Sequence, residues 1–437
     1  MKKALSILFA LSFLISTPTL ANSYTSAKKK YKKALRTKNV DQIIEALQEL
    51  AKTNSLKAVK YILTEALRLD YYGLDDAAVV KIYDAALEAL REISDKKAIQ
   101  YSIKKCASHR SWQVRVMLID VVKRYNSKAA AKAIAKNIKH KHQPVALAAI
   151  QAAKEMRSKE CIPNLIYVLK KQKKRKNLTW IETKKALVHI TGKDFDTAEE
   201  YSKWWKMAGS HFNPNRVSYG NTIIRLGKKK PPKLFGTEIF SKRIIFVLDV
   251  SGSMTAVDPP SNEGGRPGTI SPSGGGNNPA TGGGQNNESR RRITRAKNEL
   301  IKVVKMLDRD VKFNIIVFSS NVRSWKAPEK LFWASPGNKA SAIKWVQGLS
   351  ANGFTWTDEA LKEAFKNQEV NTIYLLSDGS PTKDGQNMMD TNKILEMVKK
   401  LNRFRKIRIF TLGFIGANRP FMQSLAEQNN GKYRDIK

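Results

Sequence analysis

The chain has 437 residues, of which 42% are hydrophobic and 27% charged, so it is long enough for two or three domains with a sizeable core. Beyond the N-terminal segment, no stretch approaches 18 consecutive apolar residues, which excludes a later membrane-spanning helix. The formal net charge is +41, and residues 22–235 hold 46 basic against 19 acidic residues. Such an excess either attracts polyanions or forms a self-repelling surface, and charge alone does not choose between them.

The N-terminus has the pattern of a secretory signal peptide. Lys2 and Lys3 precede an apolar run at residues 4–15, and Ala21 offers a small residue before the cut. No cysteine near that position could carry lipid. We therefore expect residues 1–21 to be removed, leaving an exported protein of the periplasm, the cell envelope or the medium, with no transmembrane segment.

Residues 22–193 are predicted to form an all-α solenoid. Apolar residues recur there at spacings of three and four, as in Ile43, Leu47 and Leu50, which indicates amphipathic helices. An internal repeat accompanies them, because the segment around Val114 matches the segment around Val145 at an offset of 31 residues. Paired helices of this period stack so that each repeat buries its face on its neighbours. The Pro-Val near a helix start and the small residues of that first helix, Ala146, Ala148 and Ala149, resemble HEAT repeats.

Cysteines and basic loops of the repeats have simple structural interpretations. Cys106 and Cys161 stand two repeats apart, beyond the reach of a disulfide, so we expect buried, unpaired thiols. Residues 139–142 and 170–176 are basic runs that we interpret as solvated loops between helices, the alternative being a polyanion clamp. His140 and His142 have no nearby carboxylate and make a poor metal site.

Residues 194–241 are predicted to be an aromatic cap followed by a linker. Trp204 and Trp205, with Trp180 before them, lie beside many lysines, a pattern that could also stack nucleic acid bases. Closure of the solenoid end explains these rings better, and we expect no nucleic acid partner. Residues 207–241 read as an extended connector because of their prolines, glycines and lysines.

A possible metal site follows at the end of a short apolar strand, residues 244–248. Asp249, Ser251 and Ser253 are oxygen donors at alternate positions, where the strand opens into a loop. Hard cations such as Mg²⁺ take oxygen ligands, and open parallel sheets bind ligands at the carboxyl ends of their strands. The next segment, residues 259–289, consists mostly of Gly, Pro, Asn, Ser and Thr, and we expect a disordered insertion.

Strands and helices alternate from there to the C-terminus, which predicts a doubly wound, mainly parallel α/β sheet. The predicted strands are residues 313–318, 322–325, 372–376, 407–412 and 432–435. The predicted helices are residues 293–307, 339–349, 358–365, 393–404 and 419–428.

Two further loops carry oxygen donors in a familiar order. The loop Gly353-Phe354-Thr355-Trp356-Thr357 precedes a helix, and Asp378 follows the strand at residues 372–376. Together with the Asp-x-Ser-x-Ser motif at 249–253, they resemble the von Willebrand factor type A domain, a Rossmann-like fold, over residues 242–437. The helical repeats before it complete a resemblance to exported bacterial proteins that join HEAT-like repeats to such a domain.

The resemblance implies a metal-ion-dependent adhesion site that binds Mg²⁺, or alternatively Mn²⁺ or Ca²⁺. Its metal ligands would be Asp249, Ser251, Ser253, Thr355 and Asp378, the carboxylates acting directly or through water. With only two carboxylates, the ion would keep an affinity for a glutamate or aspartate of a partner. The sequence departs from the family at Phe354, where many members have a small residue, and in the insertion.

Nearby acidic residues could alter that charge balance. Asp258, Asp358 and Glu359 are close to the motifs in sequence, and we interpret them as loop and helix-start residues.

These features predict a non-enzymatic adhesion or scaffold protein that captures an acidic residue of an unidentified protein ligand through its metal. The alternative is a basic protein that binds an acidic polysaccharide or an anionic surface, in which the C-terminal domain is accessory. The alternative predicts steep salt dependence and indifference to chelators. An enzyme is disfavoured, since the sequence has no HExxH, GxSxG or phosphate loop and no histidine near the proposed ligands.

Overall fold

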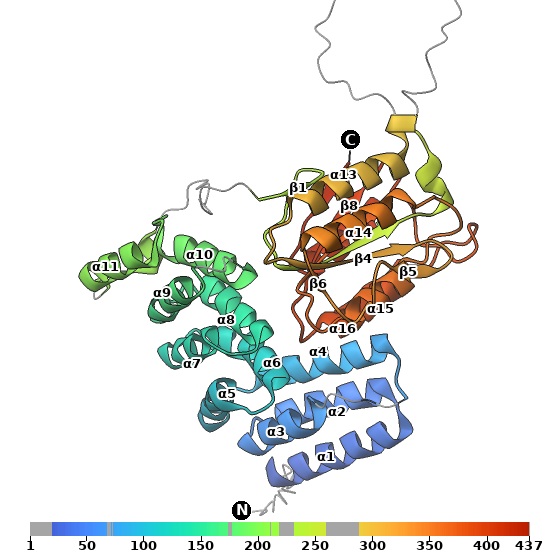
Figure 1. Cartoon of the computed structure of the whole chain (residues 1–437). Coiled ribbons are helices and arrows are strands. Elements are labelled where there is room, and N and C mark those ends of the chain that lie inside the picture. The colour runs from blue at the N-terminus through green and yellow to red at the C-terminus, as the bar shows by residue number, and fades with distance from the viewer. Residues whose placement is uncertain are drawn as a thin grey trace, which may run out of the picture. The chain divides into compact units, whose positions relative to one another are not determined.

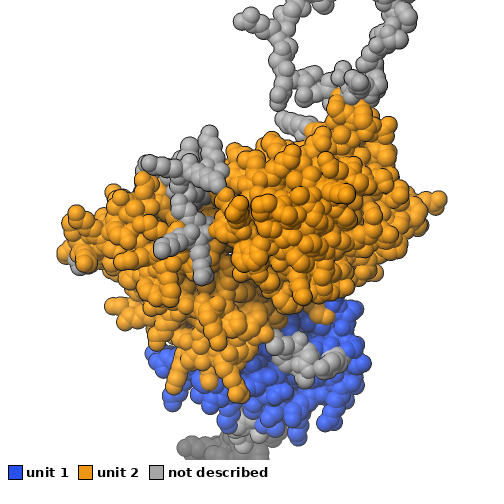
Figure 2. Space-filling model, viewed as in Figure 1, with its two compact units in different colours: residues 1–102 blue, residues 103–437 orange. Residues whose placement is uncertain are grey.

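The computed structural model describes residues 20–67, 71, 73–173, 177–209, 211–217, 231–258 and 288–436. The chain divides into two compact units, Met1–Ser102 and Ile103–Lys437, drawn in separate colours in Figure 2. Residues 1–19 of the predicted signal peptide and residues 259–287 of the predicted insertion lie outside the described residues. Those two expectations stay predictions.

The first unit consists of amphipathic helices that pack side by side, α1 against α2 and α2 against α4 (Figure 1). Side-chain caps start these helices, since Asn39, Ser55 and Asp75 each accept a hydrogen bond from a backbone amide three residues on. The helices are α1 (Leu20–Thr37), α2 (Val40–Lys52), α3 (Leu56–Tyr61), α4 (Asp76–Glu92) and α5 (Lys96–Ser108), the last crossing into the second unit.

The second unit begins with helices that stack in pairs. Helix α6 packs on α8, α8 on α10, and α7 on α9, so equivalent helices follow one another as the 31-residue offset predicts. Cys106 and Cys161 are buried and free, which confirms the prediction of unpaired thiols. The helices are α6 (Trp112–Val122), α7 (Lys128–Ile138), α8 (Gln143–Glu155), α9 (Ile162–Lys171), α10 (Leu178–Thr191) and α11 (Ala198–Ala208).

Aromatic rings gather on and beside α11, the last helix of this stack. Trp204 lies 5.9 Å from Trp205, 5.2 Å from Phe212 and 6.3 Å from Phe195, measured between ring centroids. Trp204 therefore contacts three other rings in tilted or edge-on arrangements. The predicted connector at residues 207–241 contains a two-stranded hairpin, β1 (Lys233–Leu234) and β2 (Thr237–Glu238). Sequence patterns missed the hairpin because strands of two residues have no periodicity to detect.

A mixed, mainly parallel sheet forms the rest of the chain, in the strand order β5-β4-β3-β7-β8-β9. Strands β3, β4, β7, β8 and β9 run parallel, while β5 and β6 pair antiparallel with β4. The predicted doubly wound α/β fold is confirmed. The strands are β3 (Arg243–Asp249), β4 (Lys312–Phe318), β5 (Val322–Ser324), β6 (Phe332–Trp333), β7 (Thr372–Ser377), β8 (Arg408–Gly413) and β9 (Tyr433–Asp435).

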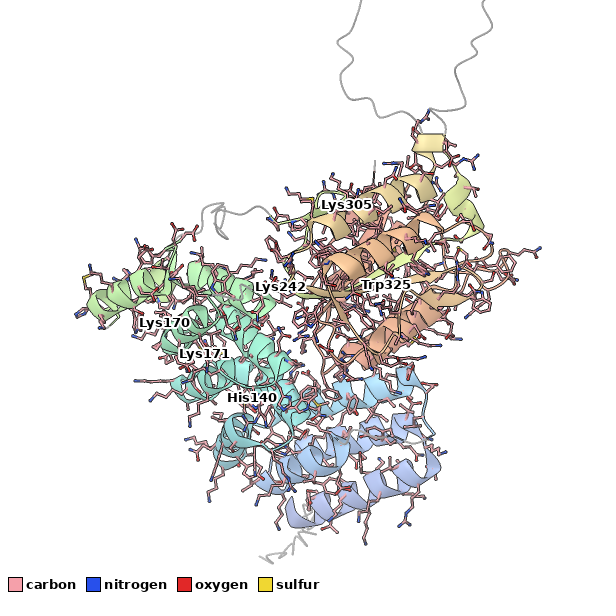
Figure 3. All side chains as sticks on the ribbon, viewed as in Figure 1. His140, Lys170, Lys171, Lys242, Lys305 and Trp325 are labelled. Carbon is pink, nitrogen blue, oxygen red and sulfur yellow. The ribbon has the colours of Figure 1, made fainter. Side chains whose placement is uncertain are left out.

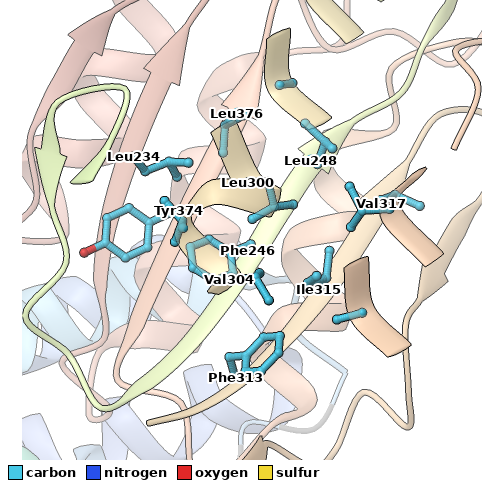
Figure 4. Packing of buried hydrophobic residues seen from close by; sticks show 14 of the residues in the cluster. Leu234, Phe246, Leu248, Leu300, Val304, Phe313, Ile315, Val317, Tyr374 and Leu376 are labelled. Atoms are coloured by element: carbon cyan, nitrogen blue, oxygen red, sulfur yellow. The ribbon is translucent and has the colours of Figure 1, made fainter. Parts of the chain in front are cut away.

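Helices cover both faces of this sheet (Figure 1). Side chains alternate along β3, so Phe246 joins the cluster with helices α13 and α14, while Val247 joins the cluster with α15, α16 and α17. Phe246 stacks on Tyr374 of the neighbouring strand at 5.8 Å (Figure 4). The helices are α13 (Arg292–Met306), α14 (Pro336–Gln347), α15 (Thr357–Lys366), α16 (Thr391–Asn402) and α17 (Arg419–Gln428).

Two predicted boundaries were wrong, and local contacts explain both. Helix α14 starts three residues before the predicted position, because Ser335 caps it and Pro336 suits the first turn. Glu288 and Ser289, placed in the disordered insertion, are helical. The Glu288 carboxylate pairs with Arg291 at 2.7 Å and accepts a hydrogen bond from Thr294 at 3.1 Å. Within the described chain, no helix combines the length and the apolar content needed to cross a bilayer.

Candidate functional site

The candidate site lies where two adjacent parallel strands end. Leu248 of β3 pairs with Leu376 of β7, so the residues that follow these strands emerge at the same edge of the sheet. Asp249 is the last residue of β3, and Asp378 directly follows β7. The pairing of β3 with β7 therefore brings together two carboxylates that are 129 residues apart in the chain.

The two serines of the first loop connect these carboxylates. Ser251 Oγ lies 3.0 Å from Ser253 Oγ, and the Ser253 hydroxyl donates a hydrogen bond to Asp378 Oδ1 at 2.7 Å. The Ser251 amide donates to Asp249 Oδ1 at 2.8 Å. The loop after β3 thus folds back so that its alternate hydroxyls point to one place.

Thr355 reaches the same place from a third loop. The Gly252 amide donates to the Gly353 carbonyl at 2.9 Å, which ties this loop to the first. Gly353 has φ +76°, and a Cβ there would lie 2.6 Å from Ser320 Oγ, so this turn requires glycine. A Cβ built on Gly379 would lie 3.5 Å from Thr355 Oγ1 and 3.6 Å from Ser253 Oγ. The three loops therefore leave a small cradle with hydroxyl oxygens on its wall.

Burial makes the negative charge of this cradle costly. Asp249 is fully buried, and its desolvation raises the pKa to about 7, with the nearby Asp378 carboxylate adding to the rise. Hydrogen bonds from Ser251 and from the Ser377 hydroxyl, the latter at 2.6 Å, offset only part of that rise. A divalent cation would remove this cost, because it favours the ionised carboxylates and takes hydroxyl oxygens as further ligands. The donor set and the cradle fit such an ion.

Arg292, which sequence reasoning missed, neutralises part of this charge. At the start of α13, its Nη1 donates to Asp378 Oδ2 at 2.7 Å, and its Nε donates to Asp258 Oδ1 at 2.9 Å. The Asp378 side chain is fully buried, and that of Arg292 is 14% exposed. Desolvation lowers the pKa of Arg292, but the bonds to Asp258 and Asp378 outweigh it and leave the pKa raised.

In the described chain, the other nearby acidic residues make no direct contact with the cradle carboxylates, and Asp258 is linked to Asp378 only through Arg292. Asp258 is bound by Arg292 and by Arg295. Asp358 lies 3.1 Å from Lys383 Nζ, and Glu359 pairs with Lys362 at 3.0 Å. In the residues that the structure describes, no three His, Cys, Asp or Glu side chains gather as a metal site. A cation in the cradle would therefore depend on hydroxyl oxygens as well as on the two carboxylates.

Two sequence signals could have pointed to the missed residues. Ser377, whose hydroxyl orients Asp249, stands directly before Asp378 in the Leu-Ser-Asp-Gly turn. Arg292 belongs to the Arg290-Arg291-Arg292 run at the start of a helix. Cations are unfavourable there because of the helix dipole, so acidic partners are expected beside them. The choice among the three arginines, however, depends on packing.

Comparison with known proteins identifies the domain around this site. A family model described as von Willebrand factor type A domain matches residues 285–435. The C-terminal region carries a von Willebrand factor type A domain. Strand β3 and the Asp249 loop precede the matched residues, but they supply the central strand of the same sheet.

Curated relatives match part of the chain. Human von Willebrand factor A domain-containing protein 3B is 29% identical over 142 residues, covering 31% of this chain and 10% of that protein. Inter alpha-trypsin inhibitor heavy chain 4 of Mus musculus is 26% identical over 210 residues, covering 45% of this chain and 18% of that protein. The chain thus spans less than a fifth of the length of either relative.

Solved structures are similar at a low level. The von Willebrand factor type A structure from Catenulispora acidiphila has a TM-score of 0.33 and 15% identity, over 46% of this chain and 40% of that one. The PilB minor pilin from Streptococcus sanguinis has a TM-score of 0.30 and 15% identity, over 46% of this chain and 58% of that one.

Proposed function

We propose that the protein is a non-enzymatic binding protein of the cell envelope that captures an acidic residue of a partner protein through a divalent metal ion. The observation that carries this proposal is the meeting of Asp249, Ser251, Ser253, Thr355 and Asp378 around one cradle, to which the described residues contribute two carboxylates. The raised pKa of Asp249 supports it, because a buried carboxylate of this kind is poised to exchange a proton for a cation.

Each of the five residues has a part in holding the ion. Asp249 and Asp378 would supply the charge, and Ser251, Ser253 and Thr355 would supply neutral oxygens that leave the ion electrophilic. The bound ion, Mg²⁺ or alternatively Mn²⁺ or Ca²⁺, would supply open positions for a carboxylate of the partner. Ser377 would hold Asp249 in orientation through its 2.6 Å hydrogen bond.

Binding is a better interpretation than catalysis for this set of groups. A metal-activated hydrolase needs a general base beside the ion. The side chains that contact Asp249 and Asp378 in the described chain are serines and Arg292, and the arginine is held in ion pairs. The signal-peptide pattern at residues 1–21 supports export, and the paired helices support a HEAT-like scaffold beside the domain.

The proposal is tested by capture from the envelope and secreted fractions of the source organism, with the mature protein and Asp249→Ala. Each is immobilised with Mg²⁺, with EDTA and at raised salt. Partners that bind only the unmutated protein, and only with the metal, support the proposal. Asp310→Ala serves as the matched control, because Asp310 is exposed and lies before β4, at the opposite end of the strands.

A direct measurement accompanies the capture. Titration of Mn²⁺ into the protein by calorimetry should give one site, and Asp249→Ala should abolish it while Asp310→Ala leaves it intact. Partners that survive EDTA and Asp249→Ala but dissociate at raised salt would refute metal-dependent capture. They would favour the alternative, a basic protein that binds acidic polysaccharide or an anionic surface.

A further inference from the structure

Two basic loops of the helical repeats that are distant in sequence meet at one pocket, which Arg243 at the start of β3 also lines. The first joins α7 to α8 and carries Lys139, His140 and Lys141, and the second follows α9, whose last residue is Lys171. Figure 3 labels His140, Lys170 and Lys171 in this part of the chain. The pocket has a volume of about 720 Å³, and none of the described residues that line it is acidic.

Tyr167 stands between these loops and organises their charges. The residue is 47% exposed, and the Nζ atoms of Lys139 and Lys171 lie 5.3 Å and 5.7 Å from its ring centroid. The ring thus attracts two ammonium groups by cation–π interaction. Neither lysine forms an ion pair with any acidic residue in the described part of the chain, so both charges are available to a ligand.

The first loop is also held in shape. The His142 ring stacks on Trp112 and on His140, each at a centroid distance of 5.4 Å. The His142 amide donates to His140 Nδ1 at 3.1 Å, and burial lowers the pKa of His140, which keeps the ring neutral near pH 7. A loop fixed in this way presents Lys139 and Lys141 with less entropy to lose on binding.

The remaining wall suits a sugar acid better than other anions. It combines neutral hydrogen-bonding groups with apolar side chains. These match a sugar acid, which presents hydroxyls and an apolar ring face beside its carboxylate. Binding of single-stranded nucleic acid relies on open aromatic faces for base stacking, and the Tyr167 ring already has two ammonium groups over it. The neutral and apolar groups on the wall are Gln143, Gln172, Asn177, Thr179, Ile138, Ala146 and Val168.

We infer that this pocket binds a segment of an acidic, carboxylate-bearing polysaccharide through Lys139, Lys141 and Lys171 around Tyr167. This site is separate from the metal cradle and does not depend on the proposed function. Its binding requires no cation and weakens as salt rises, because exposed charges are screened by ions.

The test measures binding of short galacturonate oligomers to the full mature protein by calorimetry, in EDTA and at several salt concentrations. The double variant Lys139→Gln/Lys171→Gln should weaken binding about tenfold. The matched control is Lys132→Gln/Lys136→Gln, which removes two exposed lysines of α7 that do not line the pocket and should change affinity by less than about twofold. Circular dichroism verifies that each variant is folded, and Lys141→Gln replaces the double variant if that one is not.

Four outcomes would overturn the inference. In the first, the control pair weakens galacturonate binding as much as Lys139→Gln/Lys171→Gln does, and in the second, methyl-esterified oligomers bind as tightly as the free acids. In the third, a single-stranded oligodeoxynucleotide binds more tightly than galacturonate, and in the fourth, galacturonate binding is lost in EDTA. The Asp249→Ala variant separates this site from the proposed function, because it should lose Mn²⁺ binding and retain galacturonate binding.

Discussion

Arg292 should compete with a metal ion for Asp378. The guanidinium donates to one oxygen of the buried carboxylate at 2.7 Å, so a cation that binds there must weaken this bond or share the oxygen. A hydrogen bond to a charged group contributes about 1.5–3 kcal/mol. Its removal in Arg292→Gln should therefore raise the affinity for Mn²⁺ or Mg²⁺ by about tenfold to a hundredfold.

The same substitution should destabilise the protein without metal. Asp378 would lose its cation while remaining buried, which costs about 1–3 kcal/mol of unfolding free energy. Saturation with Mg²⁺ should restore that stability, since a ligand of the folded state stabilises it in proportion to its affinity. The measurements are calorimetric titration with Mn²⁺ and urea unfolding with and without Mg²⁺.

Arg291→Gln is the matched control, because it removes the same charge from the preceding residue. Arg291 pairs with the exposed Glu288 rather than with the cradle, so its loss should leave the affinity within about twofold. If Arg292→Gln is folded and binds Mn²⁺ no more tightly than the unmutated protein, competition is refuted. Weaker binding would instead make Arg292 a residue that positions Asp378.

Three further outcomes follow from the structure. Without metal, the unfolding free energy should fall by up to about 4 kcal/mol as pH rises from 4 to 7. The reason is the raised pKa of Asp249, because the folded state then binds a proton that the unfolded state has released. Urea unfolding across this pH range measures the fall, and saturating Mg²⁺ should remove it. Gly353→Ala should lower the unfolding free energy by about 1–3 kcal/mol and weaken Mn²⁺ binding. Gly337→Ala, which adds a methyl group in open space on a helix, should not destabilise the protein. Asp194→Ala should cost about 3–5 kcal/mol in urea unfolding, since it leaves the buried Lys184 with the Phe195 carbonyl but without its carboxylate partner at 2.6 Å; a loss below about 1 kcal/mol would contradict the buried pair.

The comparison of sequence and structure is clearest in the strands around the cradle. The apolar run before Asp249 and the one before Asp378 predicted two strands that end in carboxylates, because burial on both faces makes a strand continuously apolar. Parallel strands bring their carboxyl ends to one edge, so the sequence placed both loops at that edge, and the pairing of β3 with β7 made them meet. The helices were predictable for a similar reason, since their apolar spacing is local.

Local patterns could not settle the shortest elements or the element boundaries. Strands β1 and β6 have two residues each, and they exist through pairing with partners rather than through any periodicity of their own. The start of α14 depended on the Ser335 cap, a single side-chain contact that competes with nearby alternatives.

The sequence by itself determined the helical N-terminal region, the α/β C-terminal region and the candidates around the cradle, because these depend on periodicity and on the order of motifs along the chain. Only the tertiary structure decided that Arg292, and not Arg291, reaches Asp378, and that two basic loops meet beside Tyr167. Such contacts join residues far apart in the chain. They depend on how helices pack and which rotamers that packing allows, and no local pattern records either.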